Sequence, residues 1–587
     1  MGTSSSGDVM NGYLTAGEQE RRPPLELPSL APAIFLALAI AVSYSNALRA
    51  PFHFDDWHTL EENPHIRSLA NVPRFFFDAN TTSILHENKD LRPVLVTTFA
   101  LNYAISGSDP WSYHLVNLLL HWASALLIFR IVRDHFWLGD RAVPIALAAS
   151  LLVAVHPLNT EPVNYISARS ALLTAVFYLG AFDSAVRGRR LLAAFLFAAA
   201  LLTKAIAVTL PLAILGYWLI ARARPEACAP ALSRRFLAAL FGIAAASVAY
   251  RLVLLPPWVV GATHDPDVTP WIYFMTEWSA LLHYMRLFLF PDALVIDRLD
   301  YPLTRSFLEP RAWGSLVVLA GIVAIGWKLR RRLPAMTFAI VWFFVALSAE
   351  SSFFPLAEPV NEHRPYLAML GLGALASVAL WHAAAFAARR SGAPAVWVFA
   401  VIVTAAASLL GAVTFVRNRT WQDELTIWLD ATEKAPANAR AWLNAGHAAV
   451  GRGDLDRARS LLNEGYRLSP CYAYILLNLS ALETRVGDRA AALRWAEEAV
   501  DCNPGFALTH YYRALAVENL NRFDEALADY RRTTAIDDQH ADAWLRQARL
   551  LEWQKSPAEA ARAYERAFAA DPTRAQAAAW ARQEARP

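Results

Sequence analysis

The stretch ANARAWLNAGHAAVGRGDLDRARSLLNEGYRLSP, residues 437–470, ends on a proline that recurs along the chain at a fixed interval. Five positions lie 34 residues apart, and four of them are prolines: Pro436, Pro470, Pro504, Asp538 and Pro572. Small and aromatic residues keep the same period: Trp442 and Trp544, Ala458, Ala492, Ala526 and Ala560, and Tyr530 and Tyr564. A period of this length is typical of helical hairpins that stack side by side and bury their apolar faces against their neighbours.

The 34-residue period, with its Trp, Ala and Pro positions, is typical of tetratricopeptide repeats. We therefore predict about four repeats over residues 437–587, preceded by a connecting helix over residues 417–436. Such an array presents a concave groove that binds peptides or extended segments, and a spacer or dimerisation arm is the alternative. Cys471 and Cys502 fall at adjoining ends of one predicted hairpin, so we expect either a disulfide or two unpaired thiols.

Residues 31–416 differ from the repeats because they hold one long apolar run after another. Hydrophobic residues make up 56% of the 587-residue chain and charged residues only 18%, and many of the runs have the length of a membrane span. We predict an all-α chain with a polytopic membrane domain over residues 31–416 and a disordered, cytoplasmic N-terminus over residues 1–30. Eleven spans are expected: 31–49, 112–132, 142–157, 163–186, 190–203, 205–221, 235–255, 312–329, 334–352, 365–387 and 395–415.

Lysine and arginine clusters mark the cytoplasmic loops of a membrane protein. Their distribution here places the first long loop, 50–111, and the whole repeat array on the same extracytoplasmic side. Residues 273–290 break the alternation and carry Glu277, His283 and Arg286, so we interpret them as an interfacial or re-entrant segment. A true crossing followed by a hidden return is the alternative.

Composition also bears on partners and location. The net charge of +3, without a basic stripe, argues against nucleic acid as a partner. The Ala- and Arg-rich usage indicates a GC-rich bacterial genome, so we expect the protein in the inner (cell) membrane.

An acidic pair follows the first predicted span in RAPFHFDDWHTLEENP, residues 49–64, where Asp55 and Asp56 lie among aromatic residues and histidines. Other polar side chains gather at the outer ends of later spans: Arg92, His114, His156, Glu161, Arg169, Lys204, Glu358, Glu362, His363 and Arg364. Charges at membrane depth usually face a cavity, so we expect one shared polar cavity at the outer leaflet. A carboxylate there can accept a proton from a hydroxyl, while Arg and Lys can hold phosphate oxygens.

Simpler roles are open for the same residues. An aspartate pair often closes a turn, and Lys204 can extend from a helix end towards water. Arg169 and Arg364 can form structural ion pairs with Glu161 and Glu362. If the cavity is a catalytic site, the expected activated donor is a lipid that carries a phosphosugar, because ATP and nucleotide sugars are not available outside the membrane.

The motifs FDDW, RPVLVTTFALNYAISGSDPWSYHLVNLLLH, HPLNTEPVNYISARS, HYMRLFLFP and EPVNEHRPYL, followed by the repeats, resemble the transmembrane and tetratricopeptide-repeat O-mannosyltransferases and their bacterial relatives. These enzymes belong to the GT-C class of glycosyltransferases, and the resemblance covers roughly residues 31–572. It implies a GT-C membrane domain, a polyprenyl-phosphate mannose donor and inversion at the anomeric carbon. A divalent cation on the acidic set is an alternative that we do not favour.

By motif position, the resemblance also implies roles for individual residues. Asp55 or Asp56 would act as the base on the acceptor. Basic residues would contact the lipid phosphate with histidines assisting: Arg92, Arg169, Lys204 and Arg364, with His156 and His363. His114, Glu161, Glu358 and Glu362 would line the rest of the cavity.

The predicted function is therefore transfer of a sugar, mannose by resemblance, to Ser or Thr hydroxyls of exported proteins that the repeat groove recruits. The alternatives are the same chemistry on a glycan or lipid acceptor, or a non-catalytic membrane scaffold. A transporter is a weaker option, since the sequence has no paired repeat halves.

Overall fold

The computed structural model describes residues 30–85, 88–223, 233–255 and 268–571. The predicted disordered segment, apart from Leu30, and the repeat residues from Pro572 onward lie outside these ranges. Every regular element within the described residues is helical, as predicted. In the described ranges, fifteen α-helices form the part before the connecting helix: α1 Leu30–Ser43, α2 Val72–Phe75, α3 Pro93–Ser106, α4 Trp111–His135, α5 Ala142–Ala154, α6 Thr160–Asn164, α7 Arg169–Val186, α8 Arg190–Leu201, α9 Leu210–Arg222, α10 Arg234–Leu254, α11 Pro270–Leu289, α12 Pro310–Leu329, α13 Pro334–Leu347, α14 Met369–Ser391 and α15 Ala395–Arg417.

The number of spans is smaller than predicted. Six helices in the described ranges are long and apolar enough to cross a membrane: α4, α9 with its preceding turn, α10, α12, α14 and α15 with its following turn. The segments 139–154 and 157–164 are bent by 52° at a short break and make a seventh span if they cross together. The prediction of eleven spans is therefore not supported. Helices do form in the remaining expected segments, but several are short.

Short length explains most of the difference. The helices α1, α8 and α13 have 14, 12 and 14 residues, whereas a span needs about 20. The helices α7 and α11 are longer, but polar side chains such as Asp183 and Glu277 make them less apolar. Residues 273–290, which we interpreted as an interfacial or re-entrant segment, lie in α11. This helix is unbroken over its 20 residues.

Close helix contacts hold the bundle together. Much of its buried apolar surface belongs to one cluster that draws on α1, α4, α5, α7 and α13–α15. A Cβ atom on Gly371 of α14 would lie 2.5 Å from the carbonyl oxygen of Ala339 in α13. A Cβ atom on Gly373 would lie 2.6 Å from a methyl group of Val153 in α5. Glycine at these two positions therefore lets α14 pack directly on both neighbours.

The C-terminal part is an array of paired helices with the predicted period. Helix α16, Glu424–Lys434, precedes four pairs: α17 Ala439–Gly451 with α18 Leu455–Leu468, α19 Ala473–Val486 with α20 Arg489–Cys502, α21 Ala507–Asn519 with α22 Phe523–Ile536, and α23 Ala541–Trp553 with α24 Pro557–Ala570. Both the first and the second helices begin at intervals of 34 residues. The four period-matched alanines are buried where the paired helices cross: Ala458, Ala492, Ala526 and Ala560.

One hydrogen bond recurs in the array and explains two of the sequence positions. The indole N–H of Trp442 donates to the Pro436 carbonyl at 2.9 Å, and that of Trp544 donates to the Asp538 carbonyl at 2.9 Å. In the third repeat, the His510 ring makes the equivalent bond at 3.0 Å. The early aromatic position therefore closes each of these hairpins onto the residue that ends the previous repeat.

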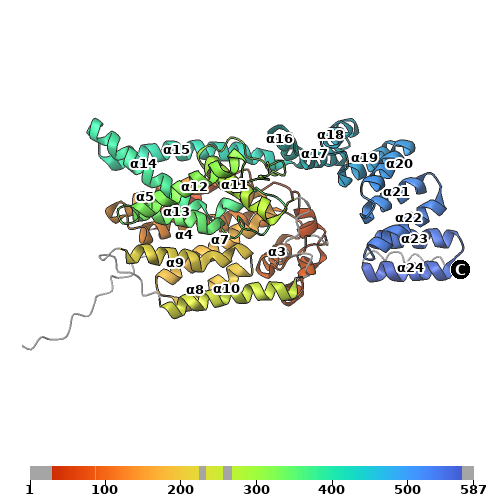
Figure 1. The fold of residues 1–587 in the computed structure, drawn as a ribbon, viewed down its shortest axis with the longest axis horizontal. Coiled ribbons are helices and arrows are strands. Elements are labelled where there is room, and N and C mark those ends of the chain that lie inside the picture. Colours follow the sequence, from red (N-terminus) through yellow and green to blue (C-terminus); the bar gives the residue numbers. More distant parts are fainter. Residues whose placement is uncertain (1–29, 86–87, 224–232, 256–267, 572–587) are drawn as a thin grey trace, which may run out of the picture.

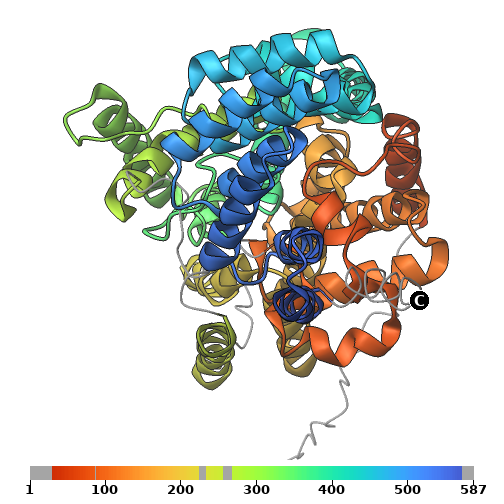
Figure 2. The ribbon, with the colours of Figure 1, turned by 90° about the vertical axis from the view of Figure 1, so that its right-hand side faces the viewer.

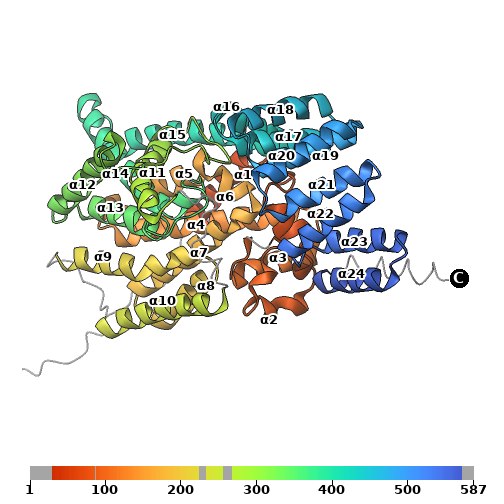
Figure 3. The ribbon, with the colours of Figure 1, turned by 45° about the vertical axis from the view of Figure 1, so that its right-hand side comes forward.

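The array is joined to one end of the membrane bundle. It starts at α16 beside α15, and its later helices curve around the end that carries α3 (Figures 1 and 3). Figure 2, which looks onto that end, shows the array crossing in front of it. A single apolar cluster contains Tyr165 and Ile296 of the bundle loops together with Trp428 of α16 and Leu443 of α17. The first repeat therefore shares a core with the loops of the membrane domain.

Candidate active site

Asp56 closes the loop that follows α1. Its Oδ2 accepts a hydrogen bond from the His53 N–H at 3.0 Å, and its Oδ1 accepts from the N–H and the hydroxyl of Ser167 at 2.8 and 2.5 Å. Burial raises the pKa of Asp56 to about 6, although the bonds from Ser167 and His53 act in the opposite direction. Both carboxylate oxygens therefore serve to hold the loop against the segment before α7, as expected of an aspartate that closes a turn.

Asp55 has a different environment from its neighbour. Its side chain is 37% exposed, and its Oδ1 lies 3.2 Å from Nε2 of His58, while its backbone N–H donates to the Tyr165 hydroxyl at 3.2 Å. Partial burial would raise the pKa of Asp55, but the bond and charge of His58, the Tyr165 hydroxyl and the charge of Arg440 lower it. Asp55 is therefore an ionised carboxylate that water, or a hydroxyl, can reach.

His58 links Asp55 to a serine, but the order of the three groups does not suit nucleophilic catalysis. His58 Nδ1 lies 2.9 Å from the hydroxyl oxygen of Ser83. Ser83 is only 1% exposed, so the hydroxyl is buried and the carboxylate is the accessible end. A serine nucleophile needs the reverse arrangement, with its hydroxyl open to substrate. His58 thus orients Asp55. The sequence could have revealed this role of His58, because His58 lies three residues after Asp55.

Three of the predicted phosphate-binding residues gather around a carboxylate. Lys204 Nζ lies 2.7 Å from Oε1 of Glu350, with both side chains nearly buried. Glu350 is also within electrostatic range of His363 and Arg364. Burial and the charge of Lys204 lower the pKa of His363 to about 3, so its ring is neutral. The alternative that Lys204 only extends towards water is wrong, because its ammonium group is paired.

Arg364 is buried and held by backbone groups. It donates to the carbonyl oxygens of Pro359, at 2.8 Å, and Glu358, and it lies 3.9 Å from Oε1 of Glu277. Glu277 is buried, and neither of its carboxylate oxygens has a hydrogen-bond partner among the residues that the structure describes. The alternative pairing of Arg364 with Glu362 does not occur, because Glu362 Oε1 accepts from the Val295 N–H instead.

Arg92 belongs to a second basic group that the sequence only partly revealed. Asp90 Oδ2 lies 2.5 Å from Arg92 Nε, and Asp90 Oδ1 lies 2.9 Å from a terminal nitrogen of Arg251. Burial alone would raise the pKa of Asp90, but the two arginines lower it to about 2. Arg251 also donates to the Leu201 carbonyl at 3.2 Å, close in the chain to Lys204. Sequence reasoning missed Arg251 and Asp90, because neither residue lies in one of the motifs that carry the family resemblance.

Arg169 is fully buried and bonded only to neutral groups. Its guanidinium donates to Asn117 and Asn102 at 2.7 Å, to the Tyr113 carbonyl at 2.9 Å and to the Thr98 hydroxyl at 3.2 Å. These contacts bring α3, α4 and the start of α7 together. The alternative that Arg169 forms an ion pair with a glutamate is wrong, because the acceptors of the Arg169 guanidinium are amide, hydroxyl and carbonyl oxygens.

The remaining predicted residues make contacts within the protein. His156 Nε2 lies 2.9 Å from the Phe288 carbonyl, and its Nδ1 accepts from the Leu158 N–H at 3.1 Å. His114 Nε2 lies 2.9 Å from the Ala50 carbonyl. Glu161 Oε1 lies 2.6 Å from His363 Nδ1, which connects the HPLNTEP and EPVNEHRP motifs.

One oxygen of Glu161 and one of Glu362 are buried and have no hydrogen-bond partner within the described part of the chain. Burial and the nearby Glu161 carboxylate raise the pKa of Glu362. The structure therefore brings these two predicted cavity residues into one buried acidic pair, beside His363.

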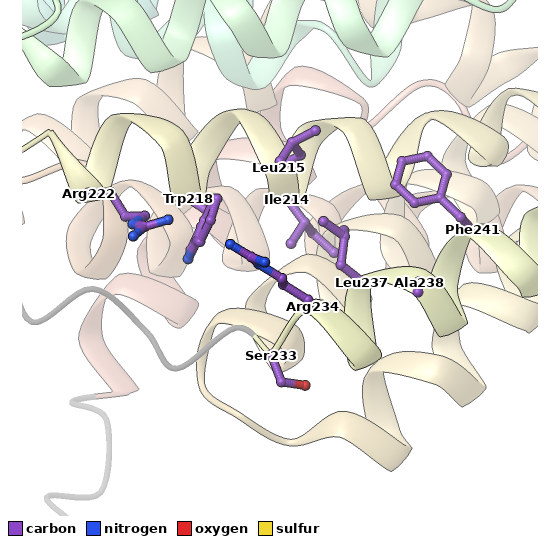
Figure 4. Close-up of a pocket in the computed structure, with 9 residues that line it drawn as sticks. All are labelled: Ile214, Leu215, Trp218, Arg222, Ser233, Arg234, Leu237, Ala238 and Phe241. Carbon is purple, nitrogen blue, oxygen red and sulfur yellow. The ribbon is translucent and has the colours of Figure 1, made fainter.

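Two cavities of the described residues lie away from these side chains. One of about 510 Å³ lies between α9 and α10, where Arg222 and Arg234 stand at one end of an apolar wall (Figure 4). Another of about 620 Å³ is lined by Trp137, Met285 and Trp381 among others. Neither cavity is lined by a predicted site residue. Among the described residues, no three His, Cys, Asp or Glu side chains are grouped so as to hold a metal ion.

Comparisons with known proteins bear on the family. No protein-family model matches the chain. Protein O-mannosyl-transferase TMTC3 of Mus musculus is 25% identical over 596 residues, which cover 91% of this chain and 63% of that protein. TMTC3 of Homo sapiens is 24% identical over 593 residues with the same coverage, and Protein O-mannosyl-transferase F38B6.6 of Caenorhabditis elegans is 23% identical over 454 residues. The chain spans 63% of the length of these curated relatives.

Solved structures match about a quarter of the chain. The crystal structure of YrrB, a TPR protein with an unusual peptide-binding site, is 20% identical with a TM-score of 0.22 and covers 25% of this chain and 76% of that chain. The crystal structure of MamA is 18% identical with a TM-score of 0.24 and covers 26% of this chain and 89% of that chain. The repeat assignment here rests instead on the 34-residue period and the helix pairs. Over 91% of its length, the chain is a distant homologue of the TMTC protein O-mannosyl-transferases.

Proposed function

We propose that the protein is a membrane glycosyltransferase that moves mannose from a polyprenyl phosphate to Ser or Thr hydroxyls of exported proteins. The observation that carries this proposal is the contrast between Asp55 and Asp56. The buried Asp56 carboxylate accepts hydrogen bonds that close the loop. The partly exposed Asp55 carboxylate is ionised and oriented by His58. The distant homology to protein O-mannosyl-transferases supports the same conclusion.

In the proposed reaction, Asp55 accepts the proton of the acceptor hydroxyl as the oxygen attacks the anomeric carbon. The new carbon–oxygen bond forms while the bond between that carbon and the phosphate oxygen breaks. The electron pair leaves on the polyprenyl phosphate, and the configuration inverts. A positioned base of this kind contributes about 10²–10⁴-fold to a rate.

The leaving phosphate needs positive charge near it. Lys204, Arg364 and Arg92 are the proposed donors, and each already has an acidic group nearby: Glu350, Glu277 and Asp90. A bound phosphate would therefore compete with these carboxylates for the cations. We assign Arg169 and His156 to holding the surrounding loops, since their polar groups are occupied by the protein.

The array would bring protein acceptors to this site, with its groove on the extracytoplasmic side of a cell membrane. The disulfide between Cys471 and Cys502 supports that side, because disulfides persist in oxidising compartments. The helix pairs have the architecture of arrays that bind extended segments.

A transfer assay tests the proposal. Purified wild-type protein in liposomes would receive polyprenyl-phosphate mannose with a radiolabelled sugar and a Ser/Thr-rich peptide. We expect label to appear on the peptide, and none when a nucleotide sugar replaces the lipid donor. Label on a lipid or glycan but not on the peptide would contradict the proposed acceptor. Absence of transfer to the peptide, to a lipid and to a glycan would contradict the proposed enzymatic activity and favour a non-catalytic scaffold.

A further inference from the structure

Phe54, directly before Asp55, has a backbone conformation that is unusual for its residue type. Its φ angle is 47°, in the left-handed region that bulky side chains rarely adopt. Such a conformation persists only where surrounding contacts hold it. The position of Asp55 therefore depends on whatever holds Phe54.

The side chains that hold Phe54 come largely from the repeat array. The ring of Trp428, in α16, meets the Phe54 ring edge-on with 5.2 Å between centroids. The guanidinium carbon of Arg440, in α17, lies 5.6 Å from the Phe54 ring centroid. The Tyr165 ring of the bundle lies 6.4 Å away on a tilted plane. Edge-on aromatic contacts and cation–π contacts both favour defined ring positions.

Arg440 is itself held in place by two loops of the membrane domain. Its Nε and one terminal nitrogen donate to the two carboxylate oxygens of Asp297, each at 2.7 Å. The same terminal nitrogen donates to Glu358 at 2.9 Å. This bidentate geometry fixes the plane of the guanidinium group. Arg440 therefore joins three loops that are far apart in the chain: those of Phe54, Asp297 and Glu358.

Helix α16 holds the residue before Phe54 as well. One oxygen of Glu424 accepts from the Trp428 indole at 2.7 Å, and the other lies 2.6 Å from His53 Nδ1. Glu424 and Trp428 are four residues apart, so they lie on the same face of the helix. The two residues that precede Asp55 are thus both held by one face of α16.

We propose that Trp428 and Arg440 are positioning residues of the active site, which hold Phe54 in its left-handed conformation and thereby set the direction of the Asp55 carboxylate. This inference rests on the proposed function. Its consequence is that the start of the array is part of the catalytic structure as well as a recruiting surface. Transfer to a small acceptor that does not need the groove should therefore depend on α16 and α17.

The charge of Arg440 has a second effect that can be measured, which is on the pKa of Asp55. The groups that act on the Asp55 carboxylate are His58 of the following turn, the Tyr165 hydroxyl and Arg440 of α17. Arg440 is among the groups that lower the pKa of Asp55. Removing its charge raises that pKa, so the acid limb of the pH–rate profile moves to higher pH.

The test uses the full chain with three variants of Arg440 and Trp428, and one matched control. Arg440→Gln removes the charge and the fork, Arg440→Lys keeps the charge, and Trp428→Ala removes the ring contact. The control is Arg459→Gln, which breaks a bidentate pair with Glu483 of 2.8 and 2.9 Å inside the array. Transfer to a short hydroxyl acceptor is measured against pH, and hydrogen exchange is measured over residues 52–60.

We expect Arg440→Gln and Trp428→Ala to lower kcat by about 10²-fold, the typical effect of a misplaced catalytic group, with little change in the KM of the donor. The acid limb moves to higher pH in Arg440→Gln and stays in place in Arg440→Lys. Exchange over residues 52–60 rises in both low-activity variants and not in the control.

Wild-type kcat, pH profile and exchange in Arg440→Gln and Trp428→Ala would overturn the inference. If the wild-type protein transfers no sugar, the proposed function fails on its own. The exchange measurement then still decides whether Trp428 and Arg440 hold the loop: unchanged exchange would overturn that claim, and faster exchange would support it.

Discussion

His53 and Glu424 are 371 residues apart in the chain, yet Nδ1 of one lies 2.6 Å from Oε2 of the other. The second ring nitrogen of His53 lies 2.6 Å from the Trp421 carbonyl oxygen. A ring that faces a carboxylate and a carbonyl carries a proton on both nitrogens. Burial alone would lower the pKa of His53, but Glu424 outweighs it and raises the pKa. The contacts at the joint between the loop and the array thus favour the charged form of the His53 ring.

This pair predicts how stability depends on pH. Because the pKa of His53 is higher in the folded protein than in an unfolded chain, the pair stabilises fully below about pH 6.5. Its contribution is lost as the pH rises through the folded pKa. We expect the melting temperature of wild-type protein to exceed that of His53→Asn by more at pH 6 than at pH 9. Glu424→Gln should behave in the same way, and His447→Asn, on the array surface, is the control. An equal difference at both pH values would contradict the ion pair.

Asp56 should act on stability, in contrast to its neighbour. Asp56→Ala leaves the Ser167 N–H and the His53 N–H without their acceptor. Each buried donor left unsatisfied costs about 1–3 kcal/mol. We expect a clear drop in melting temperature for Asp56→Ala and little change for Asp55→Ala, whose side chain is partly exposed. The reverse order would show that the two roles were assigned the wrong way round.

Arg169 should be a structural residue. Lysine carries the same charge, but it cannot donate in the planar fork that reaches Asn117, Asn102 and the Tyr113 carbonyl together. Hydrogen bonds to a charged group contribute about 1.5–3 kcal/mol each. We therefore expect Arg169→Lys to lower the melting temperature strongly, while the exposed Arg189→Lys does not. A stable Arg169→Lys protein with an increased donor KM would instead support direct phosphate contact.

The disulfide should stabilise the second repeat. It joins Cys471 and Cys502 across a separation of 31 residues, and a bridge over such a loop contributes about 2–4 kcal/mol. Replacing both cysteines by serine should lower the unfolding free energy of the array by that amount. Adding a reductant to wild-type protein should have the same effect and should not change the variant further. An unchanged wild-type melting curve under reductant would contradict a stabilising bridge.

The array could be predicted closely from the sequence, because a strict period constrains every copy at once. Pro436 and Trp442, for example, sit at fixed positions of the 34-residue period, and both take part in one recurring hydrogen bond. The number of membrane spans could not be predicted as closely. Apolar composition marks buried bundle helices and membrane spans alike, so short helices such as α8 were counted as crossings.

The predicted site residues were found by type and motif, but their partners could not be. Asp55 and Asp56 are alike in sequence, and contacts with the distant Tyr165 and Ser167 help to separate their roles. Arg440 lies in the first repeat, where its contacts with Asp297 and Phe54 follow from the docking of the array. Contacts between segments hundreds of residues apart leave no local pattern that a single sequence reveals.

The most direct test of the account is the transfer rate of Asp55→Asn with polyprenyl-phosphate mannose as donor. The change keeps the size of the side chain and removes its capacity to accept a proton, and Asp292→Asn, at an exposed carboxylate, is the matched control. We predict that Asp55→Asn loses about 10²–10⁴-fold in kcat, while its melting temperature and that of the control stay at the wild-type value. Transfer by Asp55→Asn at the wild-type rate would contradict the central claim that this carboxylate is the base.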